Sequence, residues 1–187
     1  MNWLNESELP VLWWIREHLT HPFLDTVMPY ISSLARTGEF WILLALILLC
    51  FKKTRKAGVA MGIAMACGYL IGNMGMKNLF ARVRPYDVAE VELLVAKLHD
   101  YSFPSGHTLA SFEVATVLML QNKKLGIPAL VLAVIIAFSR LYLYVHYPTD
   151  VLVGVLLGVL FGYLGVLIIN KCYSLFEKKT KNKKSEG

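Results

Sequence analysis

Long apolar runs separated by short basic clusters constrain this 187-residue chain more than any other feature of its sequence. Two of the runs, residues 57–76 and 151–169, approach the ~20 residues that a helix needs to cross the hydrocarbon core of a bilayer. Hydrophobic residues make up 56% of the chain and charged residues 17%, and a soluble domain of this size could not bury that much apolar surface. The sequence therefore predicts an integral membrane protein and excludes a disordered chain, a collagen and a secreted disulfide scaffold.

Four further apolar runs bring the predicted fold to an all-α bundle of six transmembrane helices. They are residues 23–34, 40–51, 108–120 and 125–144. The first is the weakest because it contains Asp25 and Pro29, and a count of five spans without it is the alternative. Residues 11–19, with Trp13 and Trp14, predict a helix that lies in the membrane interface. We expect an N-terminal interfacial segment at 1–21, a six-span domain at 22–177 and a charged cytoplasmic tail at 178–187.

Positive charge is concentrated in three clusters, at residues 52–56, 123–124 and 171–184, and the net charge is +6. Six spans put both termini on one side, which then holds 13 of the 19 Lys and Arg residues. The positive-inside bias predicts a multi-pass protein of the cell membrane with cytoplasmic termini. Because the basic residues form no face interleaved with aromatics, the bilayer and not nucleic acid is the expected partner.

Small residues predict close packing between the helices of this bundle. Gly154, Gly158 and Gly162 recur every four residues on the last span, a spacing that lets helices approach closely in lipid. Such a stripe serves packing within one chain or a dimer face. Glu113 lies inside the fourth predicted span, and a carboxyl group at that depth is expected to face the bundle interior.

A first polar cluster, Lys77 to Arg84-Pro85, follows the third predicted span on the non-cytoplasmic side. If that span continues as a helix, a step of seven residues places Lys77 and Arg84 on one face, two turns apart. Pro85 then ends the helix, which leaves Arg84 at its rim. Two cations without an acidic neighbour in the sequence suit an anion, although alone they also fit two snorkelling membrane anchors.

A second cluster, Pro104-Ser105-Gly106-His107, stands directly ahead of a predicted helix. Ser105 or Gly106 can cap that helix, and its free backbone N–H groups form a seat for an anion. His107 stands in the first turn, where it can donate a proton to a bound group. Alone, the cluster is also a helix cap beside an unrelated histidine.

A third cluster contains Ser139-Arg140 and then His146 and Asp150. On a continuous helical turn, a spacing of four residues brings the carboxylate of Asp150 to the imidazole of His146. Such a carboxylate fixes the tautomer of the ring and stabilises its cationic form. A structural His–Asp cap is the alternative, and two histidines with few carboxylates do not predict a metal site.

Together the three clusters supply what phosphoryl transfer requires: cations for the phosphoryl oxygens, a nucleophile, and an acid for the leaving oxygen. Polar groups at membrane depth are costly and usually functional. The clusters therefore predict one site on the extracytoplasmic side.

The sequence resembles the type-2 phosphatidic acid phosphatase superfamily of integral membrane lipid phosphatases. The three signatures of that family are K-x6-RP, PSGH and SR-x5-H-x3-D. Every signature position is matched, by Lys77, Arg84 and Pro85, by Pro104 to His107, and by Ser139, Arg140, His146 and Asp150.

The resemblance implies a mechanism without metal or cofactor. His146 would attack phosphorus to form a phosphohistidine, Asp150 would orient His146, and His107 would protonate the leaving oxygen and then help to activate water. The phosphoryl oxygens would be held by Lys77, Arg84, Arg140, Ser105 and the Gly106 amide.

The expected substrate is a membrane lipid phosphate or diphosphate, with undecaprenyl diphosphate preferred. Phosphatidylglycerophosphate and phosphatidic acid are alternatives. A transporter that binds phosphate lipids without hydrolysis is a hypothesis from another class, and a vanadate-dependent haloperoxidase is a third, disfavoured by the spans. The loop at 86–103 forms part of the rim or a lid, or is an ordinary solvated linker.

Overall fold

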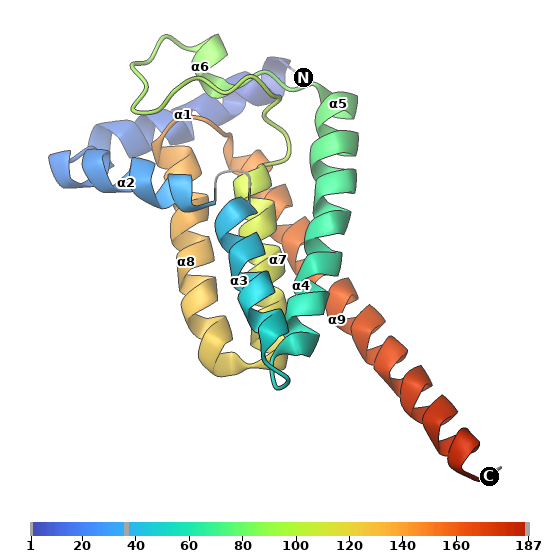
Figure 1. Ribbon diagram of the computed structural model, residues 1–187. Helices are drawn as coiled ribbons and strands as arrows, with labels where there is room; N and C mark the ends of the chain where they lie inside the picture. Colours follow the sequence, from blue (N-terminus) through green and yellow to red (C-terminus); the bar gives the residue numbers. More distant parts are fainter. Residues whose placement is uncertain (1, 36–37, 186–187) are drawn as a thin grey trace.

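The computed structural model describes residues 2–35 and 38–185 and is all-helical, with no strand in those ranges (Figure 1). Its elements are α1 (Asn2–Leu19), α2 (Pro22–Leu34), α3 (Glu39–Cys50), α4 (Arg55–Cys67), the π-helix η2 (Gly68–Met76), α5 (Lys77–Phe80), α6 (Pro85–Val88), α7 (Gly106–Gln121), α8 (Lys123–Tyr142) and α9 (Pro148–Ser185). The predicted all-α class is confirmed.

Helix α7 forms the centre of the bundle and packs against α3, α4, α8 and α9 (Figure 1). Its apolar side chains belong to a core shared with these helices, and most of its residues are buried. Glu113 on α7 is only 1% exposed, which confirms that it faces the interior.

The glycine stripe on α9 is the contact between the two most closely packed helices. A Cβ atom on Gly158 would lie 2.7 Å from the carbonyl oxygen of Leu109, and one on Gly162 would lie 2.7 Å from the carbonyl oxygen of Glu113. Any larger side chain would therefore push α9 away from α7. The stripe serves packing within the chain, the first of the two predicted uses.

The predicted count of six spans is not confirmed. In the described part of the chain, three helical stretches are long and apolar enough to cross a membrane: Arg55–Val88, Lys123–Tyr142 and Pro148–Phe176. The pair α2 and α3, bent by 50°, adds at most a fourth. The predicted first span corresponds to α2, whose 13 residues reach only about 20 Å of the ~30 Å required. Helix α2 lies across the end of the bundle, beside α1 (Figure 1).

Helix α1 and the C-terminal part of α9 lie at opposite ends of the bundle (Figure 1), and the predicted placement of both termini on one side of the membrane stays a prediction. Helix α1 is held in its place by the buried Asn5 and Glu8, which bond to Arg82. The three basic clusters all lie at the other end, in the turns after α3 and α7 and along the end of α9. The predicted tail begins inside α9, and residues 186–187 lie outside the described residues.

Candidate active site

The chain turns sharply between the two cations of the first motif. The helical stretch that begins with α4 ends at Phe80, and Ala81 adopts the left-handed conformation, with φ 43°. Arg84 is extended because the following Pro85 excludes a helical conformation, and Pro85 begins α6 instead of ending a helix. The prediction that Lys77 and Arg84 lie two turns apart on one helix face is therefore wrong.

The two cations nevertheless converge, on a carboxylate. Lys77 Nζ donates to Asp100 Oδ2, and Arg84 Nη2 donates to Asp100 Oδ1 at 2.7 Å. Lys77 and Arg84 are buried, whereas the Asp100 side chain is 54% exposed. Partial burial alone would raise the pKa of Asp100, but Lys77 and Arg84 outweigh it and hold that pKa well below its usual range. The loop residue Asp100 thus occupies the cations that the sequence assigns to phosphate.

His146 lies in the short connection between α8 and α9, with its two ring nitrogens in different surroundings. Arg84 Nη1 lies 3.3 Å from Nε2, and because a guanidinium can only donate, Nε2 is the acceptor and Nδ1 carries the proton. Nδ1 lies 3.4 Å from Asp150 Oδ2. Burial lowers the pKa of His146 well below its usual value, and the neighbouring cations Arg84, Arg140 and Lys77 lower it further. The imidazole is therefore neutral, and the lone pair on Nε2 faces the guanidinium of Arg84.

Asp150 reaches His146 by a turn, not along a continuous helix, because α9 begins only at Pro148. Its Oδ2 accepts hydrogen bonds from the Tyr147 backbone N–H at 2.9 Å and from the Ser102 hydroxyl at 2.5 Å. Its Oδ1 accepts from Arg82 Nη1 at 2.6 Å. The predicted contact between His146 and Asp150 is present, but the predicted helical path to it is not.

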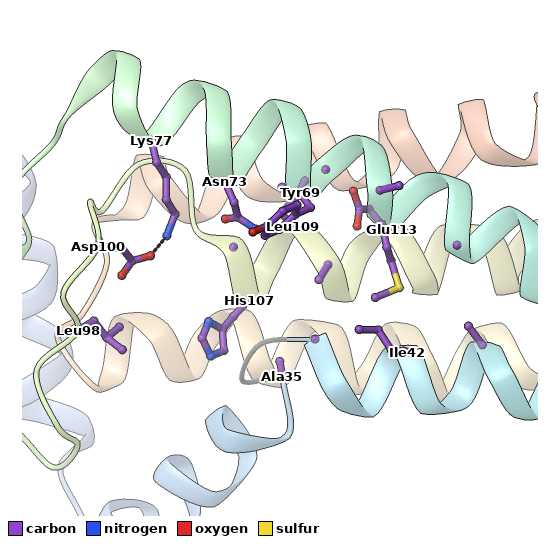
Figure 2. Close-up of a pocket in the computed structure, with 18 of the residues that line it drawn as sticks. Ala35, Ile42, Tyr69, Asn73, Lys77, Leu98, Asp100, His107, Leu109 and Glu113 are labelled. Atoms are coloured by element: carbon purple, nitrogen blue, oxygen red, sulfur yellow. Dashed lines mark hydrogen bonds and ion pairs between the residues drawn. The ribbon is translucent and has the colours of Figure 1, made fainter.

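The second motif forms the N-terminus of α7. Ser105 occupies the N-cap position, although its hydroxyl pairs with Thr108 Oγ1 at 2.9 Å and does not bond to a backbone N–H. A Cβ atom on Gly106 would lie 2.7 Å from Asn73 Oδ1, so the Asn73 side chain would have to shift for any larger residue. His107 follows in the first turn of α7 and lines the same cavity as Lys77 and Asp100 (Figure 2).

Arg140 lies at the end of α8 and is held from α2. Its Nη1 donates to the Ser32 hydroxyl, and the side chain is almost completely buried. Its Nε finds no hydrogen-bond partner among the described residues. A buried donor without a partner is costly in a protein interior, so this atom is suited to an incoming acceptor.

These residues surround the polar end of a cavity of about 960 Å³. Of the predicted site residues, Lys77, Arg84, Gly106, His107 and His146 line it, whereas Ser105, Arg140 and Asp150 are not among its lining residues. From Lys77 and His107 the cavity continues past Tyr69 and Leu109 toward Ile42 and Glu113, as Figure 2 shows. Its other wall residues there are mainly apolar and come from α3, α4 and η2. The cavity is polar at one end and apolar along its length.

Sequence reasoning missed several residues of this site. Asp100 was assigned only to the loop, and nothing in its spacing from Lys77 or Arg84 indicates the ion pairs. Arg82 and Ser102 bond to Asp150 although neither belongs to a signature. Across the described ranges, no three His, Cys, Asp or Glu side chains converge as a metal would require.

Comparison with known proteins bears on the family and the fold of the chain. The model of the PAP2 superfamily matches residues 54–174. An undecaprenyl-diphosphatase of Sulfolobus acidocaldarius is 37% identical over 147 residues, which cover 78% of this chain and 70% of that protein. The crystal structure of LpxE from Aquifex aeolicus superimposes with a TM-score of 0.77 at 30% identity, covering 86% of this chain and 94% of that one. A PAP2-type phosphatidylglycerolphosphate phosphatase of Bacillus subtilis gives 0.75 at 28%, covering 91% and 88%.

Proposed function

This chain belongs to the PAP2 superfamily, and from that premise we propose that it removes one phosphate from a lipid diphosphate at the membrane surface, with undecaprenyl diphosphate as the first candidate. The chain is a lipid phosphatase, a hydrolase, as its homologues are. The proposal extends this to a phosphohistidine on His146, to the substrate, and to the orientation in the membrane.

The observation that carries the proposal is the shape and polarity of the cavity. Its polar end holds Lys77, Arg84 and the two histidines, which suit a phosphoryl group. Its apolar arm between α3, α4 and α7 suits a hydrocarbon chain that enters from the lipid. A water-soluble phosphate ester would have no use for that arm.

In the first step, Nε2 of His146 attacks phosphorus and the bond from phosphorus to the leaving oxygen breaks. The neutral imidazole supplies the lone pair, and the carboxylate of Asp150, 3.4 Å from Nδ1, stabilises the ring as it becomes positive. Burial and the nearby cations lower the pKa of His107, and an anionic substrate beside it would offset those cations. Protonated in this way, His107 donates its proton to the leaving oxygen, so that the lipid monophosphate departs. In the second step, water that gives a proton back to His107 attacks the phosphohistidine and releases inorganic phosphate.

The oxygens of the transferred phosphoryl group are held by the residues that the sequence motifs predict for this role. Lys77 and Arg84 face the cavity, and Arg140 offers its unpartnered Nε. The N-terminus of α7 adds Ser105 and the backbone N–H of Gly106. This arrangement stabilises the negative charge that the transition state spreads over three oxygens. Asp100 must leave Lys77 and Arg84 when the phosphoryl group arrives.

The charge distribution supports an extracytoplasmic site. The three basic clusters lie at the end of the bundle away from the cavity's polar end, and such clusters face the cytoplasm in membrane proteins. In this orientation α1 and α2 lie on the outer side, where the exposed Trp13 and Trp14 suit the membrane interface. The site would then act on lipid phosphates of the outer leaflet.

Phosphate release from purified protein in detergent tests the proposal. We expect release from undecaprenyl diphosphate that is lost in His146→Ala and kept in His18→Ala, a control histidine exposed on α1. Turnover of phosphatidylglycerophosphate and phosphatidic acid at the same detergent fraction ranks the alternative substrates. Absence of release from all three lipids, with binding retained, would instead indicate a phosphate-lipid transporter. Activity should survive EDTA, and its loss on chelation would contradict the metal-free mechanism.

A further inference from the structure

Arg82 is a buried group at the site that bonds to four other side chains, although no signature of the sequence includes it. The side chain is 2% exposed. Its Nη1 donates to Asp150 Oδ1 at 2.6 Å and to Thr149 Oγ1 at 2.7 Å, and its Nη2 donates to Glu8 Oε1 at 2.7 Å. The guanidinium also stacks on Tyr147, with 3.9 Å from Cζ to the ring centroid.

Glu8 brings the N-terminal helix into the same network. Besides Arg82, its carboxylate accepts the backbone N–H of Thr149 at 2.7 Å, in the first turn of α9. Asn5, one turn earlier on α1, accepts from Arg82 Nε at 2.8 Å. Helix α1 thus contacts both the residue that bonds Asp150 and the helix turn that carries it.

We propose that Arg82 and Glu8 are positioning residues that fix Asp150, so that its second oxygen stays directed at Nδ1 of His146. This inference rests on the proposed function, in which His146 is the nucleophile. It makes α1 a part of the catalytic machinery, although the helix touches neither the cavity nor the phosphoryl group.

The fixed orientation follows from how the oxygens of Asp150 are divided. Arg82 occupies Oδ1, while Ser102 and the Tyr147 N–H share Oδ2 with His146. A carboxylate rotated away from His146 would have to break a buried ion pair, which costs more than a surface pair because the charge left behind is desolvated. Glu8 in turn prevents Arg82 from moving with it.

The balance of charge points the same way. One guanidinium is shared between the two carboxylates of Glu8 and Asp150, so this buried group carries a net negative charge. That charge favours a positive imidazole, which His146 becomes as it attacks phosphorus. Replacing Glu8 by a neutral residue leaves Arg82 to neutralise Asp150 completely.

The test compares Glu8→Gln and Arg82→Lys with Glu6→Gln, an exposed carboxyl two residues away on the same helix. We expect kcat for lipid diphosphate to fall roughly 10- to 100-fold in both, the cost of a small displacement of a catalytic group. KM and inhibition by inorganic phosphate should stay within about twofold, because the phosphate-binding cations are unchanged. The double variant should be little worse than Arg82→Lys alone, since the residues act as one unit.

A merely structural role would lower the thermal unfolding temperature while leaving kcat per folded molecule unchanged, and that result would overturn the inference. So would a kcat within twofold of wild type in both variants, or a parallel loss of kcat and of phosphate inhibition. His146→Ala in the same assay separates the two proposals. If that variant stays active, the proposed function fails; if it is inactive while Glu8→Gln and Arg82→Lys retain wild-type kcat, only the positioning role fails.

Discussion

Two carboxylates, Asp150 and Asp100, each pair with arginine at the polar end of the cavity, but in opposite surroundings. Asp150 is completely buried and its oxygens bond to Arg82, Ser102 and the backbone. Asp100 lies on a loop with about half of its side chain exposed. A buried pair that cannot exchange with water suits a fixed part of the machinery, whereas a half-exposed pair can be displaced by a substrate anion.

The difference teaches which acidic group a phosphatase can tolerate beside its phosphate. Asp150 is not among the lining residues of the cavity, and it contacts His146 at Nδ1, not at Nε2. Asp100 lines the cavity and holds Lys77 and Arg84 until an anion competes for them. In the proposed mechanism the first carboxylate assists the chemistry, whereas a substrate anion displaces the second.

The largest expected effect comes from the buried carboxylate. Asp150→Asn should lower kcat about 10³- to 10⁴-fold, as when the carboxylate that orients a catalytic histidine is replaced by an amide. Inhibition by inorganic phosphate should change little. Steady-state kinetics check this, with Asp87→Asn as the control for an exposed carboxyl group. A loss below tenfold would remove the distinction between the two carboxylates.

Arg84 lies between the exposed carboxylate of Asp100 and the histidine that Asp150 contacts. It bonds to Asp100, to the Val145 carbonyl and to His146 Nε2. Arg84→Lys keeps the charge but cannot span these partners, so kcat/KM should fall about 100-fold, as for loss of one donor to the reacting group. The same assay measures it. An unchanged kcat/KM would mean that charge alone suffices.

The exposed carboxylate should act in the opposite direction. Asp100→Asn frees Lys77 and Arg84, so inorganic phosphate should inhibit about two- to fivefold more strongly, the range for an ion pair with one exposed partner. Dose–response curves for phosphate check this. Glu90→Gln, an exposed carboxyl group on the same loop, is the control. Weaker inhibition in Asp100→Asn would show that Asp100 helps to build the anion site.

The smallest effect concerns pH and needs no substitution. The lowered pKa of His146 keeps its imidazole neutral as the pH falls through about 6.5, where an ordinary histidine becomes protonated. The acid limb of kcat/KM should therefore lie below 6.5. Asp100 does not contribute in this range because its pKa is held far lower. A limb above 6.5 would mean that His146 is charged in the free enzyme.

The motifs predicted which residues meet at the site better than they predicted the backbone structure between those residues. Lys77, Arg84, His107 and His146 do share a cavity, because the spacing within each motif reflects a local requirement. Yet Arg84 is reached by a turn at Ala81 and Asp150 by a turn before α9. A helix was expected to continue to Arg84, and a helical turn was assumed between His146 and Asp150. Pro85 and Pro148 are compatible with several local structures and do not show where the chain turns.

The non-local part of the site could not be predicted. Glu8 and Arg82 are 74 residues apart, and no periodicity relates an N-terminal helix to a loop so distant. The prediction for the termini depends on the number of spans. The apolar run at 23–34 was counted as a span, and an even number of spans puts both termini on one side. Its 13-residue helix α2 instead lies across the bundle, where Ser32 holds Arg140.

The most direct test of the account is to trap phosphate on the protein. Lipid diphosphate labelled in its terminal phosphate is mixed with enzyme and quenched in base within one turnover, and the labelled residue is then identified by mass spectrometry. We expect label on His146 in wild type and in Asp150→Asn at a lower rate, and none in His146→Ala. Label on another residue, or phosphate release by His146→Ala at the wild-type rate, would contradict the central role of His146.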